Sequence, residues 1–203
     1  MTIENFNSEL LATTSDIERR KFIHKHIFHG TPFVFQNEEE RYFEFRNRIA
    51  QNFSIGFYEV FIVGSAKFGF SYWKHKDFDF NSDIDVVIVN ERLFEEFYKK
   101  ICDYQYNLDR FYKTISIAER KEYHKFLHYL IKGWMRPDLL PTSFQMDLLK
   151  KEWWDFFNSI SNNKSEVGNY DVKAGLYKNY YYLEKYYLFG IELHCNNLKI
   201  NQN

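Results

Sequence analysis

The sequence predicts one α/β (α+β) domain, a small mixed sheet flanked by helices that continues into a helical, aromatic-rich C-terminal part. Two β-prone runs, residues 58–63 and 83–89, are separated by segments in which apolar residues recur every three or four positions. Hydrophobic residues make up 45% and charged residues 27% of the 203 residues, which is the balance of an ordinary globular protein with one core. Aromatic residues reach 21%, so we expect rings to fill much of that core.

The bulk properties restrict the class of protein. We expect a single domain over residues 1–203, with a core at about 38–115 and a helical extension at about 116–203. The net charge of −1 argues against a protein that coats nucleic acid by bulk charge, although a local basic groove remains open. Cys102 and Cys195 are too far apart in the sequence to indicate a disulfide framework or a zinc site. With no long apolar run either, the sequence predicts a cytoplasmic protein with no membrane partner.

Two helices are predicted before the first strand. Ser15 and Glu18 have the spacing of a capping box and would open a helix that Gly30 and Pro32 end. The second helix is expected over residues 38–53, where large apolar residues recur at three- and four-residue steps.

The two β-prone runs differ in character. Residues 58–63 form a short strand that a Gly-Ser pair closes, and residues 66–82 are expected to be a polar, aromatic loop. Residues 83–89 read as a buried strand, because β-branched residues follow one another on both faces. Asn90 stops this strand and can cap the helix that follows.

The second half of the chain is expected to be mostly helical from about residue 117 onward. Apolar stripes run through residues 126–131 and 148–160, and residues 159–169 form a polar turn. Residues 170–177 are compatible with a strand or with a lead-in to the tyrosine-rich terminal helix.

A pair of carboxylates begins the most apolar strand. Because side chains alternate along a strand, Asp83 and Asp85 are expected to point to the same side. Two adjacent carboxylates repel each other and are tolerated mainly where a cation neutralises them, and oxygen ligands favour Mg²⁺ or Mn²⁺. The pair therefore indicates a metal site.

A Gly-Ser pair ends the preceding strand. Gly64 lets the backbone approach a ligand closely, and the Ser65 hydroxyl can bind phosphate. A metal beside a phosphate-binding turn is the equipment for phosphoryl or nucleotidyl transfer.

The string VGSAKFGF…SDIDVVIV resembles the signature of the polymerase β-like nucleotidyltransferase superfamily. The matching residues are Gly64, Ser65, Gly69, Ser82, Asp83 and Asp85. The resemblance covers residues 58–90. It implies a nucleotidyltransferase-like fold in which Asp83 and Asp85 hold the catalytic metals, while Gly64, Ser65 and Ser82 belong to the nucleotide site.

The same resemblance implies a third carboxylate on a neighbouring strand downstream. Asp171 is one candidate and is taken as the third catalytic residue, whereas Asp147, in a segment that reads as helix, is the other. If neither completes the site, the chain has two carboxylates or is inactive. The loop over residues 66–82 is longer than is common in the superfamily, and it is either a substrate-contacting lid or a surface insertion.

Several lysines are candidates to contact phosphate, namely Lys67, Lys173 and Lys178. The expected reaction moves a nucleotidyl group from a nucleoside triphosphate to a hydroxyl of an RNA end, a nucleotide, a protein or a small molecule. Stand-alone bacterial proteins of this appearance serve in toxin, antiphage or antibiotic-modifying roles. The alternative is an inactive regulatory module that binds nucleotide or RNA, and the sequence leaves partner proteins and the oligomeric state open.

Overall fold

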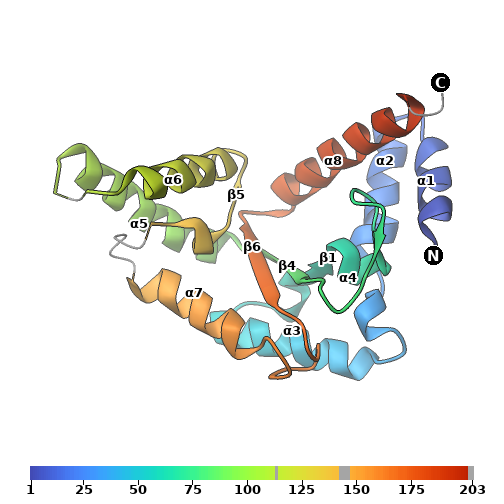
Figure 1. Ribbon diagram of the computed structural model, residues 1–203, viewed down its shortest axis with the longest axis horizontal. Coiled ribbons are helices and arrows are strands. Elements are labelled where there is room, and N and C mark those ends of the chain that lie inside the picture. Colours follow the sequence, from blue (N-terminus) through green and yellow to red (C-terminus); the bar gives the residue numbers. More distant parts are fainter. Residues whose placement is uncertain (113, 142–146, 201–203) are drawn as a thin grey trace.

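The computed structural model describes residues 1–112, 114–141 and 147–200, except for the side chains of residues 147–149. This part of the chain is a mixed α/β protein with eight α-helices, a four-stranded sheet and a two-stranded hairpin (Figure 1). The helices are α1 (Ile3–Leu11), α2 (Asp16–Ile23), α3 (Glu39–Phe53), α4 (Gly64–Phe68), α5 (Glu91–Asp109), α6 (Ile117–Leu130), α7 (Asp147–Ser159) and α8 (Tyr180–Ile200). The strands are β1 (Val60–Val63), β2 (Phe70–Ser71), β3 (Lys76–Asp77), β4 (Ile84–Val89), β5 (Trp134–Met135) and β6 (Val172–Tyr177).

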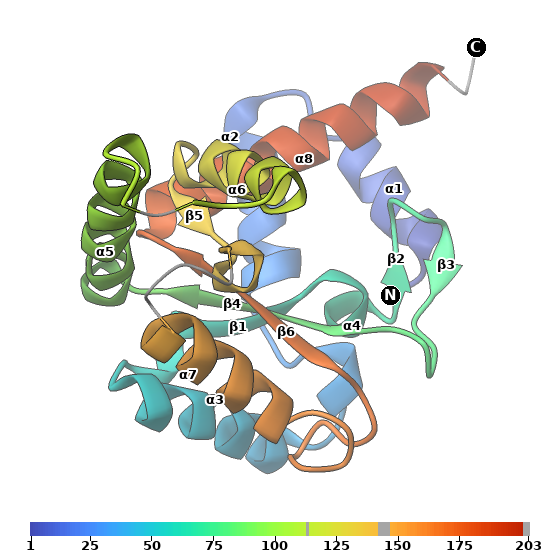
Figure 2. The same cartoon turned by 60° about the vertical axis from the view of Figure 1, so that its left-hand side comes forward.

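The main sheet joins strands from distant parts of the chain in the order β1-β4-β6-β5 (Figure 2). Strand β1 is antiparallel to β4, with Val63 opposite Asp85. Strand β6 runs parallel to β4 and places Lys173 opposite Asp85, while β5 is antiparallel to β6. The sheet therefore reaches beyond residues 38–115 into the half of the chain that was expected to be mostly helical. There β6 takes the strand alternative for residues 170–177, and the two-residue strand β5 was not expected.

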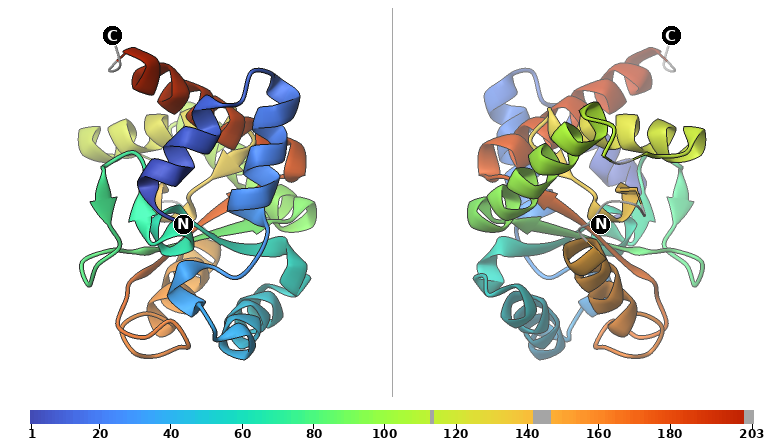
Figure 3. Two further views of the ribbon diagram at one scale, coloured as in Figure 1. Left: turned by 90° about the vertical axis from the view of Figure 1, so that its right-hand side faces the viewer. Right: turned by 90° about the vertical axis from the view of Figure 1, so that its left-hand side faces the viewer.

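The two faces of the sheet carry separate hydrophobic clusters. Val86 and Ile88 face the first cluster, to which α3, α5, α6 and α7 contribute. Val87 and Val89 face the second, which contains side chains of α1, α2 and α8. The views from either side show α3 and α7 on one side of the sheet and α1, α2 and α8 on the other (Figure 3). Since side chains alternate along β4, Asp85 faces the side of α1, α2 and α8.

Short-range signals predicted several element boundaries well. Ser15 and Glu18 form the expected capping box at the start of α2, and α3 covers nearly the whole of the expected helix. The Asn90 side chain accepts a hydrogen bond from the Leu93 backbone N–H at 2.8 Å and caps α5. These boundaries depend on neighbouring residues, which is why the sequence reveals them.

The segment over residues 66–82 differs from the predicted loop. It contains most of the short helix α4 and the hairpin of β2 and β3. Gly69 ends α4 at φ +85°, a conformation that glycine adopts easily. Elements of two to five residues are too short for a periodic pattern, so α4, β2, β3 and also β5 could not be recognised in advance.

Aromatic side chains fill both clusters, as the composition suggested. The largest fully buried rings are Phe6, Phe35, Phe45, Phe97 and Phe126. Over the described residues, no helix is both long enough and apolar enough to cross a membrane.

Candidate active site

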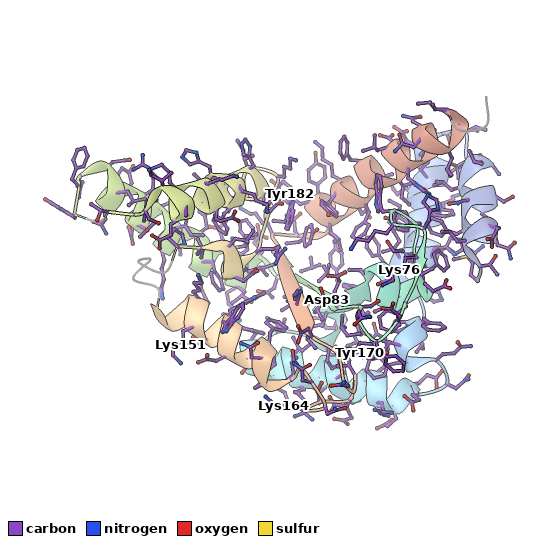
Figure 4. The ribbon with its side chains drawn as sticks, viewed as in Figure 1. Lys76, Asp83, Lys151, Lys164, Tyr170 and Tyr182 are labelled. Atoms are coloured by element: carbon purple, nitrogen blue, oxygen red, sulfur yellow. The ribbon has the colours of Figure 1, made fainter. Side chains whose placement is uncertain are left out.

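The predicted carboxylate pair lies at the start of β4, and Asp83, labelled in Figure 4, lies beside the start of β6, which pairs in parallel with β4. Asp83 immediately precedes the strand, and Asp85 is its second residue. Both side chains reach solvent, although Asp85 is closely surrounded by protein atoms. The pair therefore forms an acidic spot at the beginning of the inner strand β4, which is otherwise apolar.

Gly64 brings the backbone directly against Asp85. It follows the last residue of β1 and begins α4 with φ +65°. A Cβ atom at this position would lie 2.7 Å from Oδ2 of Asp85, which is too close for a real carbon–oxygen contact. Only glycine allows both this φ and this approach. The half-buried Ser65 follows, so the Gly-Ser turn begins directly beside the Asp85 carboxylate.

Lys173 contacts the carboxylate pair directly. Its Nζ atom lies 2.6 Å from Oδ2 of Asp83, and its backbone pairs in register with Asp85. The two side chains are 50% and 40% exposed, so water screens much of this ion pair.

The pKa of Asp85 is raised above its usual value. Burial is the main cause, because it disfavours the charged carboxylate, and the negative charge of Asp83 adds to it. The positive charges of Lys173, Arg136 and Lys74 act in the opposite direction. Three cations from β6, from the residue after β5 and from the β2–β3 turn thus influence this carboxylate.

An aromatic group borders the site. The ring of Trp134 stacks between those of Tyr129 and Tyr177, with centroids 4.2 and 5.6 Å away, and Tyr186 meets it edge-on at 5.3 Å. Burial raises the pKa values of Tyr177 and Tyr186, and the charge of Asp85 contributes to both shifts. The indole N–H of Trp134 is buried and has no hydrogen-bond partner among the described residues.

The donor set fits one divalent cation whose other ligands come from phosphate and water. Mg²⁺ is usually held by one or two carboxylates together with substrate phosphates. Among the described residues, no group of three or more His, Cys, Asp or Glu side chains could hold a metal ion. Asp83 and Asp85 therefore offer a two-carboxylate site.

Of the two candidates for a third carboxylate, Asp171 does not form a group of three carboxylates with this pair among the described residues. Asp171 precedes β6, and its Oδ1 accepts a hydrogen bond from Nδ2 of Asn162 at 2.8 Å. Its backbone carbonyl accepts the N–H of Ile84. Asp147 begins α7, but its side chain lies outside the described residues.

Two further residues predicted to bind the nucleotide hold loops in place. The Nζ atom of Lys67 donates to the carbonyl oxygens of His29 and Gly30, at 2.6 and 2.8 Å. The Oγ atom of Ser82 accepts from the Asp79 backbone N–H at 3.0 Å and donates to its carboxylate at 3.2 Å. Contacts of Lys67 and Ser82 with phosphate stay predictions.

The sequence did not single out Arg136 or Lys74. Arg136 follows the two-residue strand β5 and is paired with Asp138, at 2.6 Å. Its location beside Asp85 depends on the pairing of β5 with β6, which no local pattern reveals. Lys74 lies in the loop over residues 66–82, and the expectation that this loop is either a substrate-contacting lid or a surface insertion was the only hint of a role for Lys74.

Two surface hollows lie outside the carboxylate site. The larger, of about 310 Å³, has Phe33, Phe78, Phe80 and Tyr170 among its lining residues. The smaller, of about 210 Å³, lies near the end of α8, where Trp73, His75 and His194 line it. Neither hollow is lined by Asp83 or Asp85.

Comparison with family models, with curated proteins and with solved structures finds no match for this chain.

Proposed function

We propose that this chain is a metal-dependent nucleotidyltransferase, which moves a nucleotidyl group from a nucleoside triphosphate to a hydroxyl acceptor. One observation carries the proposal. Gly64 starts α4 in a conformation and at a distance that bring the Gly-Ser turn directly against Asp85. A phosphate-sized group at the turn would therefore lie beside the two carboxylates, which is the arrangement that nucleotidyl transfer requires.

The residues of the site have distinct roles in this reaction. Asp83 and Asp85 would hold Mg²⁺ or Mn²⁺, and the Gly64–Ser65 turn would contact the phosphate chain. The cation supplies neutralisation of the triphosphate and of the pyrophosphate leaving group. The acceptor oxygen bonds to the α-phosphorus, the bond from that phosphorus to the bridging oxygen of pyrophosphate breaks, and the hydroxyl proton passes to water.

The surrounding charges support an anionic substrate. Lys173, Arg136 and Lys74 all act on the charge of Asp85, so their positive field covers the same small region. A triphosphate with one bound cation still carries negative charge, and these side chains can offset it. Asp171, expected to help activate the acceptor, is bonded to Asn162, so that role stays a prediction.

The alternative is an inactive module that keeps the fold and binds nucleotide or RNA. The ion pair between Lys173 and Asp83 favours it, because an ammonium group stands where further negative ligands would strengthen metal binding. A role in toxin action or antiphage defence, and the acceptor itself, rest on the resemblance alone.

The test is Mg²⁺-dependent consumption of the four nucleoside triphosphates in the presence of cellular RNA. Wild type is compared with the Asp83→Asn/Asp85→Asn double variant, which keeps the shape of both side chains and removes their charge. We expect release of pyrophosphate by the wild type alone, and the labelled product would identify the acceptor class. If both proteins are inert and bind nucleotide equally well, the catalytic proposal fails and the binding module is favoured.

A further inference from the structure

Lys173 has a place in the site that makes it more than a general positive charge. Its backbone lies on β6 directly across from Asp85, while its Nζ atom donates a hydrogen bond to Asp83. One lysine is therefore adjacent to both carboxylates. The contact joins residues that are 90 positions apart in the sequence, and it depends on the parallel pairing of β4 and β6. The pairing of the two strands therefore fixes the position of the Lys173 backbone beside the carboxylates.

We propose that Lys173 is an exchangeable counter-ion of the carboxylate pair. In the protein without nucleotide it pairs with Asp83, and when a divalent cation and a nucleoside triphosphate bind together it moves to the phosphate chain. The inference rests on the proposed function and describes how ligand binding at that site is regulated: the metal ion alone binds weakly, and metal and nucleotide bind cooperatively.

Electrostatic competition gives the reason. An ammonium group 2.6 Å from Oδ2 of Asp83 occupies an oxygen that a divalent cation needs, and the two cations repel each other. Binding of the metal alone must therefore break the ion pair without offering Lys173 a new partner. A triphosphate supplies that partner, because its oxygens accept hydrogen bonds from an ammonium group.

The side chain of Lys173 is suited to such an exchange. A lysine is a compact charge on a flexible four-carbon stem, and this one is 50% exposed. Its ammonium group can leave Asp83 without being transferred into an apolar environment. Arg136, by contrast, is tied to Asp138 by a hydrogen bond from each of two guanidinium nitrogens, Nε and Nη2.

Lys178, a candidate phosphate contact in the sequence, pairs in the structure with α5 and so offers a matched control. It follows the last residue of β6, and its Nζ atom lies 2.6 Å from Oε1 of Glu95, the same distance as in the Lys173 pair. It is 30% exposed and is paired with the α5 residues Glu95 and Glu91, and neither Asp83 nor Asp85 is among its partners. Loss of Lys178 removes a similar ion pair just after the same strand, away from Asp83 and Asp85.

The experiment measures two affinities in wild type and in Lys173→Met, Lys173→Arg and Lys178→Met. Binding of Mn²⁺ alone is followed by the loss of the free-ion signal in electron paramagnetic resonance. Binding of labelled α,β-methylene nucleoside triphosphates at saturating Mn²⁺ is followed by equilibrium dialysis. Thermal melting checks that each variant is folded.

The two affinities should change in opposite directions in Lys173→Met. We expect Mn²⁺ alone to bind about two- to fivefold more tightly and the nucleotide about two- to fivefold more weakly, the range of a partly exposed ion pair. Lys173→Arg should recover nucleotide binding, and Lys178→Met should match wild type in both assays. A structural role would weaken both ligands together.

Two results would overturn the inference: equal affinities in Lys173→Met and wild type, or changes of the same sign for both ligands. Failure of the proposed function gives a different pattern. In that case wild type binds no nucleotide at any Mn²⁺ concentration, whereas the effect of Lys173→Met on Mn²⁺ alone still reports whether the lysine competes for Asp83.

Discussion

Substitution of Gly64 by alanine should disturb the site through one added carbon atom. The new Cβ would lie 2.7 Å from Oδ2 of Asp85, so the carboxylate must rotate away. At φ +65° a residue with a Cβ also loses about 1–2 kcal/mol relative to glycine. Rotation of the Asp85 side chain off its preferred geometry adds about 1 kcal/mol. We therefore expect Gly64→Ala to lower the free energy of unfolding by about 2–3 kcal/mol.

Urea denaturation followed by circular dichroism measures this loss, and Gly168→Ala is the matched control. Gly168 has φ +80°, but a Cβ there would meet no atom within 4 Å. It should lose only the backbone part, about 1–2 kcal/mol. The excess in Gly64→Ala should disappear when Asp85 is also replaced by alanine, because the clashing oxygen is then gone.

Equal losses at Gly64 and Gly168 would refute the reasoning. So would an excess that persists in the Asp85→Ala background, since the cost would then arise elsewhere. A second readout is binding of nucleotide with Mn²⁺, which should weaken in Gly64→Ala and remain unchanged in Gly168→Ala.

Three further predictions concern stability, each measured by urea denaturation. Burial lowers the pKa of Lys67 from 10.5 to about 8, so the unfolded chain binds this proton more tightly than the folded one between those pH values. Below pH 8 the buried charge lowers the stability of the folded state, and this cost fades as the pH rises toward 10.5. Wild type should therefore gain stability relative to Lys67→Met from pH 8 to pH 10. Asn90→Ala should lose about 1–2 kcal/mol, because the cap of α5 is removed, and Asn90→Ser should recover most of it. Phe6→Ala should lose about 3–5 kcal/mol, because this fully buried ring packs against Phe22 and Phe68 in the second cluster.

Each of these predictions has an outcome that contradicts it. Parallel pH profiles for wild type and Lys67→Met would show that Lys67 keeps its ordinary pKa. An equal loss in Asn90→Ala and Asn90→Ser would place the role of Asn90 in its bond to Glu59 instead of the cap. Phe80 is 86% exposed, and Phe80→Ala should change stability by no more than about 0.5 kcal/mol. A comparable loss at Phe6 and Phe80 would argue against the described packing.

Signals from neighbouring residues made part of the fold predictable. The capping box at Ser15, the cap at Asn90 and the β-branched run of β4 each depend on a few adjacent residues. The order of strands in a sheet, by contrast, depends on residues far apart in the sequence. Nothing local to Val172–Tyr177 shows that it pairs with β4, which lies more than 80 residues earlier, so the sequence could not show that this segment belongs to the same sheet.

In the candidate site, too, the sequence could not show how β6 is aligned with β4. Residues 170–177 were recognised as a possible strand, but their alignment with β4 could not be. The observed register puts Lys173 across from Asp85, and a shift of two residues would put Asp171 there instead. A lysine and an aspartate at this position give opposite charges to the site. Because side chains alternate with a period of two, both alignments keep the same face and the same hydrophobic pattern.

The central claim is transfer of a nucleotidyl group at the Asp83/Asp85 site, and the position of a label on the triphosphate tests it most directly. Wild type and Asp83→Asn/Asp85→Asn are incubated with Mg²⁺, cellular RNA and each triphosphate labelled at either the α- or the γ-phosphate. We predict that the α-label enters the acceptor while the γ-label is released as pyrophosphate, and only with wild type. Transfer of the γ-label to the acceptor, or equal transfer by both proteins, would contradict the account.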